Sequence, residues 1–186
     1  PLPYGTDVSG DDTALQPSTA EYVIDMSSAE SDAMRQTFTQ LLTLMDRGSA
    51  RIDPALRRLF PDGYREDRAA ADELRRFTEA TLRDGKQESS RQVLTDLPKG
   101  EGRVRLSFDR AELWLTALTD ARLVLGSRLN ITAETDVIAL LDAQSQEPAP
   151  ESEAATFLLA IYQHLTFLQE SLLRAITSSD DHLDHP

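Results

Sequence analysis

The sequence predicts a single, mainly helical domain that carries a small two-stranded antiparallel β element. Three observations lead to this fold class. Apolar residues recur at helical spacing over several long segments, two short segments alternate apolar and polar residues, and polar capping residues stand where the helices should begin. At 186 residues the chain suits one core rather than two. We place this domain at residues 21–177, between a disordered N-terminal segment at 1–20 and a disordered acidic tail at 178–186.

Two strands are expected, and each is followed by a helix. The two strand-helix units resemble each other when residue n is aligned with residue n + 82. In each unit three apolar residues alternate with polar ones, as in a strand with one buried face. These triplets are Tyr22, Ile24 and Met26, matched by Val104, Leu106 and Phe108. A pseudo-twofold relation between the units would pair the strands antiparallel and bring opposite charges face to face. The charged residues are Glu21 and Asp25 on one strand and Arg103 and Arg105 on the other.

The helix starts in both units have the spacing of a capping box. Ser27 stands three residues before Glu30, and Asp109 stands three residues before Glu112. At this spacing an N-cap oxygen and a returning carboxylate satisfy the free amides of the first turn. We therefore expect Ser27 and Asp109 to begin the two helices.

The apolar stripes set the lengths of these two helices. The first should run to about residue 45, and the second should run from about 110 to 125, where Gly126 ends it. The stripes are Met34, Phe38, Leu41, Leu42 and Met45 in the first helix, and Trp114, Leu118, Ala121 and Leu125 in the second.

Three further helices complete the predicted core. Asp53 and Pro54 begin a short helix that ends at Phe60, because Pro61 disfavours helical geometry in the residue before it. The segment Pro61-Asp62-Gly63 has turn chemistry. A long helix follows and ends near residue 97, with a bend allowed at Gly85, and a last helix spans about 152–177. The inner faces are Ala70, Leu74, Phe77, Thr81, Leu82, Val93 and Leu97 in the long helix, and Leu158, Ile161, Leu165, Leu168, Leu172 and Ala175 in the last. The last stripe can pack in the core or pair with a second copy in a homodimer.

Composition excludes several classes of function. The sequence has no cysteine, so it carries no disulfide, thiolate metal site or thiol switch. No apolar run is long enough to cross a bilayer, and we expect a soluble, cytoplasmic protein. The net charge of −13 disfavours nucleic acid and anionic membrane as partners and favours another protein.

The sequence contains no recognisable catalytic or cofactor motif. There is no phosphate-binding glycine loop, no nucleophile elbow and no His-Glu-x-x-His pattern. His182 and His185 lie in the acidic tail, and His164 lies near the stripe of the last helix, where we expect a hydrogen-bonded boundary residue. We predict a protein that is not an enzyme and that has no cofactor and no metal.

Arginines gather on the long helix and the corner before it. Residues 47–91 carry eleven Lys/Arg against nine Asp/Glu, although the whole chain is strongly acidic. Arginine forms bidentate contacts with carboxylates, so these side chains suit a partner-binding face. Acidic neighbours can also pair with them, which would make them a solvated face only. The partner-binding candidates are Tyr64, Arg65, Arg68, Arg75 and Arg76.

The paired stretches LFPDGYRED and WLTALTDARLVLGSRL resemble an uncharacterised actinobacterial family. Genes of this family often lie beside the gene for the Clp protease adaptor ClpS, and the resemblance covers roughly residues 56–177. It implies a cytoplasmic bacterial protein linked to oxidative-stress regulation of transcription through a sigma factor. Without cysteine, a disulfide switch cannot be carried over to this chain. We therefore expect regulation by protein contact, with a sigma factor or a Clp component as partner. The alternatives are a direct DNA-binding regulator and an adaptor in Clp proteolysis.

Overall fold

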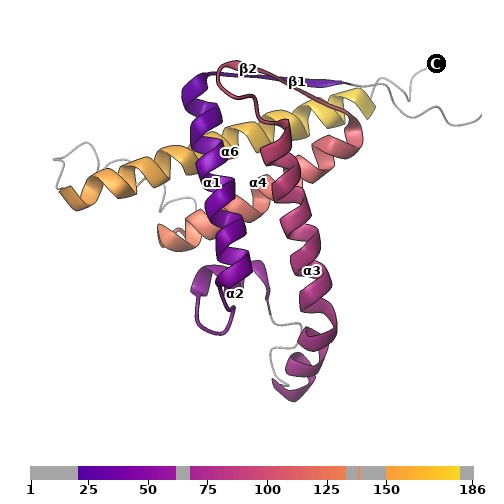
Figure 1. The fold of residues 1–186 in the computed structure, drawn as a ribbon, viewed down its shortest axis with the longest axis vertical. Helices are drawn as coiled ribbons and strands as arrows, with labels where there is room; N and C mark the ends of the chain where they lie inside the picture. The colour runs from indigo at the N-terminus through magenta and orange to yellow at the C-terminus, as the bar shows by residue number, and fades with distance from the viewer. Residues whose placement is uncertain (1–20, 62–67, 133–137, 139–149, 181–186) are drawn as a thin grey trace, which may run out of the picture.

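The computed structural model describes residues 21–61, 68–132, 138 and 150–180, and it leaves the side chains of 68–77, 150–152 and 179–180 undescribed (Figure 1). In this part of the chain there are five helices and two strands. In chain order they are β1 (Tyr22–Met26), α1 (Ser28–Arg47), α2 (Pro54–Leu59), α3 (Arg68–Asp96), β2 (Gly102–Leu106), α4 (Phe108–Arg128) and α6 (Pro150–Asp180). The predicted fold class is confirmed. Helix α6 continues three residues beyond the boundary expected at residue 177.

The helices pack in pairs beneath the β ribbon. α1 contacts α3, α3 contacts α4, and α4 contacts α6. In Figure 1, α1 and α3 lie side by side, α4 and α6 cross them, and the ribbon of β1 and β2 lies across one end. The buried core includes Phe38 and Met34 of α1, Trp114 of α4 and Leu165 of α6.

The two strands pair antiparallel, as predicted, with Ile24 opposite Val104. The expected charge pairs form on the outer face of the ribbon. Arg103 Nε lies 2.7 Å from Asp25 Oδ1, and Arg105 Nη1 lies 2.7 Å from Glu21 Oε2. The inward positions Tyr22, Met26, Val104 and Leu106 are buried.

The offset between the two strand-helix units is 80 residues rather than 82. Ser27 caps α1 in the predicted capping box with Glu30, but Ser107 caps α4, and its hydroxyl accepts the Arg110 amide at 3.5 Å. Asp109 therefore lies inside the first turn. Phe108, which continues the apolar alternation of the strand, is the first residue of the helix, and this produced the wrong alignment. At an offset of 80, the buried positions Met34, Phe38, Leu41 and Met45 match Trp114, Leu118, Ala121 and Leu125.

Helix α4 does not end at Gly126 as expected. It continues to Arg128, and Asn130 takes the left-handed conformation, with a φ of 54°. The amide of Ile131 then donates to the Gly126 carbonyl at 2.8 Å, which satisfies a free carbonyl of the last turn. Asparagine tolerates this backbone conformation better than other residues with a Cβ, so it serves where glycine was expected.

The C-terminal end of α3 is held by side chains from α1 and α4. The Asp96 carboxylate accepts the Trp114 indole N–H at 2.9 Å and lies 2.6 Å from Arg110 Nη1. Arg35 of α1 donates to the carbonyls of Leu97 and Pro98 at 3.1 and 3.0 Å. These contacts fix where the chain leaves α3 and turns into β2.

The predicted inner face of α3 is correct at its C-terminal end and wrong in its middle. Val93 and Leu97 are buried, whereas Thr81 and Leu82 are exposed. The helix runs through Gly85 as expected. In the middle of the helix, polar residues face the interior instead. These residues are Lys86, Ser89 and Ser90, and the two serines are buried. A search for apolar spacing cannot detect such a face.

Helix α2 has the predicted cap and the predicted core contacts. The Ala55 amide donates to Asp53 Oδ1 at 2.8 Å, and Arg128 Nη2 lies 2.6 Å from Asp53 Oδ2. Burial alone would raise the pKa of Asp53, but the hydrogen bonds from Arg128 and the Ala55 amide outweigh it and lower the pKa. Leu56, Leu59 and Phe60 are buried as expected. The rest of the predicted corner, residues 62–67, lies outside the described chain.

Replacing Phe60 with Ala should destabilise the fold strongly, because its ring is only 2% exposed and the change leaves a cavity. We expect a loss of about 3–5 kcal/mol in the free energy of unfolding, measured by urea denaturation. Ile52→Ala is the matched control: Ile52 is 81% exposed, so its loss should change stability by no more than about 0.5 kcal/mol. Equal effects of the two changes would contradict the burial of Phe60.

A buried ion pair joins the middle of α3 to α4. Lys86 Nζ lies 2.5 Å from Asp120 Oδ1, and Asp120 is 1% exposed. Its second oxygen is buried without a hydrogen-bond partner. Burial raises the pKa of Asp120, and the Lys86 ammonium opposes this effect without cancelling it.

Lys86→Met should cost about 3–5 kcal/mol near neutral pH, because it leaves the Asp120 carboxylate buried and unpaired. The double variant Lys86→Met with Asp120→Leu should recover most of this loss, since no buried charge remains. The folded state binds the Asp120 proton more tightly than the unfolded state, whose ordinary pKa is 3.8. Removing the Lys86 ammonium should raise the folded-state pKa of Asp120 further. The cost of Lys86→Met should therefore grow as the pH rises through and above the folded-state pKa of Asp120 in the unchanged protein, which already lies above the ordinary value. Denaturant titrations at several pH values measure it, and a cost that shrinks with rising pH would reject this account.

Candidate partner-binding groove

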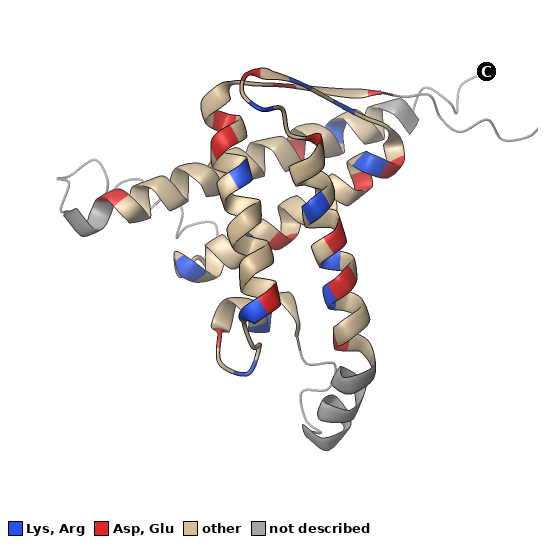
Figure 2. Cartoon of the chain, viewed as in Figure 1, with Lys and Arg blue, Asp and Glu red and all other residues tan. Residues whose placement is uncertain are grey.

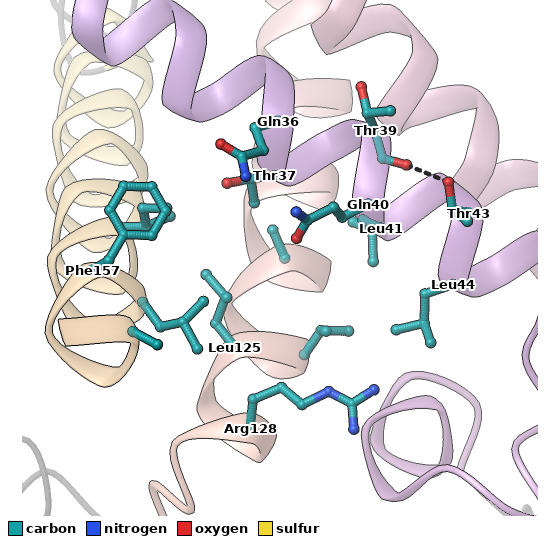
Figure 3. Close-up of a pocket in the computed structure, with 15 residues that line it drawn as sticks. Gln36, Thr37, Thr39, Gln40, Leu41, Thr43, Leu44, Leu125, Arg128 and Phe157 are labelled. Atoms are coloured by element: carbon teal, nitrogen blue, oxygen red, sulfur yellow. Dashed lines mark hydrogen bonds between the residues drawn. The ribbon is translucent and has the colours of Figure 1, made fainter. Parts of the chain in front are cut away.

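A groove of about 820 Å³ lies between α1, α4 and α6 (Figure 3). Gln36, Gln40 and Leu44 line it from α1, Leu125 lines it from α4, and Phe157 lines it from α6. In Figure 3, Phe157 stands opposite the glutamines of α1, with Leu125 between the two helices. The Phe157 ring is 48% exposed, which is unusual for so large an apolar side chain.

The threonines in this groove present methyl groups more than hydroxyl groups. The hydroxyls of Thr37, Thr39 and Thr43 donate to carbonyls one turn earlier in α1, at 2.8, 2.7 and 2.9 Å. The last of these bonds is the dashed line in Figure 3. A hydroxyl that is bonded to its own helix has less capacity for a partner. The surface is therefore more apolar than its residue names indicate.

The stretches of α1 and α6 that wall the groove contain no Asp, Glu, Lys or Arg. In α1 no Asp, Glu, Lys or Arg occurs from 36 to 45, and in α6 none occurs from 154 to 169, although 27% of the chain is charged. Figure 2 shows these stretches in tan. Arg128 also lines the groove, and its guanidinium is paired with Asp53. Depletion of charge with an exposed aromatic residue is typical of the centre of a protein interface.

The predicted partner-binding residues are not tested by the structure. Tyr64 and Arg65 lie in the undescribed segment 62–67. Arg68, Arg75 and Arg76 belong to α3, but their side chains fall outside the described part of the chain. The arginine face therefore stays a prediction.

Arg83, a later member of the same arginine series, has an internal role. Its guanidinium lies 4.6 Å from the centre of the Phe60 ring, donates to the Met45 carbonyl and pairs with Glu79 Oε1 at 2.7 Å. These contacts connect α3 with the end of α1 and with the residue that follows α2. The arginines of the long helix thus do not form one uniform solvent-exposed face.

His164 lies at the boundary of the core, as expected, but the hydrogen bond expected for its ring is not seen among the described residues. Its Nδ1 atom is 3.7 Å from Glu30 Oε1, and its Nε2 atom is buried without a hydrogen-bond partner. Hydrogen bonds from the Ser27 hydroxyl and amide lower the pKa of Glu30. Among the described residues, no group of three or more acidic or histidine side chains is arranged to hold a metal ion. Across these same ranges, no helix is both long and apolar enough to span a membrane.

The groove was missed at the level of sequence because it requires three helices to meet. A usable signal was nevertheless present in the charge-free stretches at 36–45 and 154–169. Only one face of each stretch is needed for the core. The remaining positions would ordinarily carry charged residues, so their lack of charge is not explained by burial.

The chain belongs to the family described as Domain of unknown function (DUF2017), which matches residues 12–176. Relatives in two mycobacteria, Mycobacterium bovis and Mycobacterium tuberculosis, are named oxidative stress regulator AosR. Each is 31% identical over 140 residues, which cover 68% of this chain and 60% of the relative. A Mycobacterium leprae relative with the designation AosR is 32% identical over 155 residues, or 75% of this chain and 67% of its own.

The chain thus spans between 60% and 67% of the length of these relatives. No solved structure matches it. The family and the names of its mycobacterial relatives agree with the link to oxidative-stress regulation that the resemblance implied, whereas the ClpS gene neighbourhood and the sigma factor stay predictions.

Arg83→Ala should destabilise the protein, since it removes a charged donor from the Met45 carbonyl and uncovers the Phe60 ring. We expect a loss of about 1.5–3 kcal/mol in unfolding free energy, measured by urea denaturation. Arg91→Ala on the same helix is the matched control, because its side chain is exposed and should contribute no more than about 0.5 kcal/mol. If the two changes cost the same, Arg83 belongs to the solvated face after all.

Proposed function

We propose that this protein is a non-catalytic regulator in a stress response and that it acts by binding a partner protein. The observation that carries the proposal is the largely apolar groove between α1, α4 and α6, with Phe157 at its wall and with Arg128, already paired with Asp53, as its charged lining residue. The mycobacterial relatives named oxidative stress regulators supply the physiological setting. Because the chain has no cysteine, its own response does not use a thiol.

The partner segment proposed for the groove is a helix with an uncharged apolar stripe. A charged side chain directed into the groove would lose water without gaining an ionic partner, because Arg128 is already paired with Asp53. Leucine, methionine or phenylalanine side chains would cover Phe157, Leu44 and Leu125 instead. Polar contacts at the edge would come from the amides of Gln36 and Gln40.

The arginines at the start of α3 form a second part of the proposal. Arg68, Arg75 and Arg76 would contact acidic side chains of the same partner and orient it. In keeping with the family resemblance, we propose a stress-responsive sigma factor as the first partner to test and a Clp component as the second. DNA is disfavoured by the net charge of −13.

Two variants test the proposal in the organism that carries the gene. Phe157→Asp places a charge in the groove, and Arg75→Glu with Arg76→Glu reverses the proposed second contact. Phe157 is half exposed, so Phe157→Asp should change unfolding free energy by no more than about 0.5 kcal/mol. We expect both variants to fail to restore stress-dependent transcription in a deletion strain. Both should also lower affinity for the purified sigma factor about tenfold or more.

Ile52→Asp is the matched control, because Ile52 is exposed and lies away from the groove. It should behave like the unchanged protein. If Phe157→Asp binds the sigma factor and each Clp component normally and restores transcription, the groove is not the binding surface and the proposal is wrong. Affinity that falls steeply with salt for DNA rather than for protein would favour a DNA-binding regulator instead.

A further inference from the structure

The strand β1 has an open edge that the proposed function does not use. Among the described residues the sheet has two strands in the order β1-β2, so β2 occupies only one edge of β1. In an antiparallel pair, alternate residues direct their backbone N–H and C=O groups away from the partner strand. Such an edge is a template for a further strand.

This edge opens into a second groove, of about 590 Å³, that is separate from the first. Glu21 and the strand β1 that follows it form one wall, and the second half of α6 forms the other with Phe167, Leu168 and Leu172. Phe167 is 62% exposed and is the most exposed aromatic ring in the described part of the chain. A strand edge beside an apolar helix face is the arrangement in which extended peptides bind by strand addition.

We propose that this second groove binds an extended, basic segment of a partner protein, which adds to β1 as a third strand. The inward side chains of the added strand would cover the exposed ring of Phe167, next to Leu168 and Leu172, which are already buried in the core. Its outward side chains would lie beside the outward side chains of β1. The proposal concerns a different surface from the groove at Phe157 and does not depend on it.

The charge of the added strand follows from the outer face of β1. Glu21 and Asp25 point outwards there and are half exposed or more, although each is paired with an arginine of β2. Directly opposite residues on neighbouring strands approach within about 4.5–5.5 Å at Cβ. A lysine or arginine on the added strand would therefore give each carboxylate a second cation on its open side. Since Glu21 and Asp25 are four residues apart, the two cations should have the same spacing.

A second copy of this chain suits the same edge less well. Parallel pairing of β1 with β1 of another molecule in register sets Glu21 and Asp25 opposite their own copies, and the antiparallel register that sets Glu21 opposite Asp25 also brings carboxylates together. Only antiparallel pairing of Tyr22–Met26 over its full length avoids this, because it sets Asp25 opposite Val23. Like charges directly opposite on neighbouring strands are destabilising. Glu30 also lines the groove, and hydrogen bonds from Ser27 lower its pKa, which keeps it charged. A basic partner segment gives Glu21 and Asp25 a further cation, whereas an identical strand brings more carboxylates to the groove.

The test uses a labelled peptide, Thr-Lys-Val-Thr-Val-Lys-Thr, and fluorescence anisotropy with the full chain. Its lysines are four residues apart, and its valines occupy the inward positions. We expect saturable binding, and we expect the version with glutamate at both lysine positions to bind about tenfold more weakly or worse. Phe167→Ser should weaken binding by about tenfold, while the matched control Leu173→Ser, at an exposed position of the same helix that does not line the groove, leaves it unchanged.

Strand addition also predicts a dependence on alternate peptide amides. Two further peptides carry N-methyl groups on either the odd or the even residues, which removes one set of donors at a time. Only one of the two should lose binding, because an added strand bonds to β1 through every second residue.

Several results would overturn the proposal: no binding of the basic peptide, equal loss with both methylated peptides, or indifference to Phe167→Ser. Self-association that Phe167→Ser abolishes, without peptide binding, would assign the groove to a second copy. The outcome is independent of the groove at Phe157, since the two sites are changed by different phenylalanines.

Discussion

The carboxylate of Asp96 is the contact on which the placement of the other elements depends. It stands at the last residue of α3, with the indole of Trp114 and the guanidinium of Arg110 on α4 as its partners. A buried carboxylate without such partners would be costly, so α3 and the first turns of α4 are held in one relative position. The end of α3 and the start of α4 are therefore fixed in position, and β2, which lies between them in the chain, is placed against β1.

The 80-residue offset allows equivalent positions of the two strand-helix units to be compared, and the units differ at the proposed binding groove. Gln40 on α1 and Asp120 on α4 occupy equivalent positions. Asp120 is closed over by Lys86 of α3, while Gln40 lines the open groove beside α6. In one half of the repeat this position thus forms an internal ion pair. The other has kept it uncharged and accessible, which is what a binding surface requires.

Much of the fold could be predicted because its signals are local. Ser27 with Glu30, Asp53 with Pro54, and the charges of Glu21 and Asp25 opposite Arg103 and Arg105 act within a turn or a strand pair. The misplaced start of α4 arose where two local signals overlapped, since Phe108 continues the strand pattern and Ser107 can cap. The ion pair of Lys86 with Asp120 and the groove at Phe157 could not be predicted, because both require knowing which helix faces meet. The arginines before residue 77 were named from local charge balance and helical spacing, which indicate a class of contact without placing it.

The linkers between the strands and their helices are each a single residue, Ser27 after β1 and Ser107 after β2. A one-residue connection with a hydrogen-bonded cap leaves almost no independent rotation between strand and helix. The orientation of α1 relative to β1, and of α4 relative to β2, is therefore closely fixed. The two helices that leave the ribbon through these serines, α1 and α4, are also two of the three helices that wall the groove at Phe157.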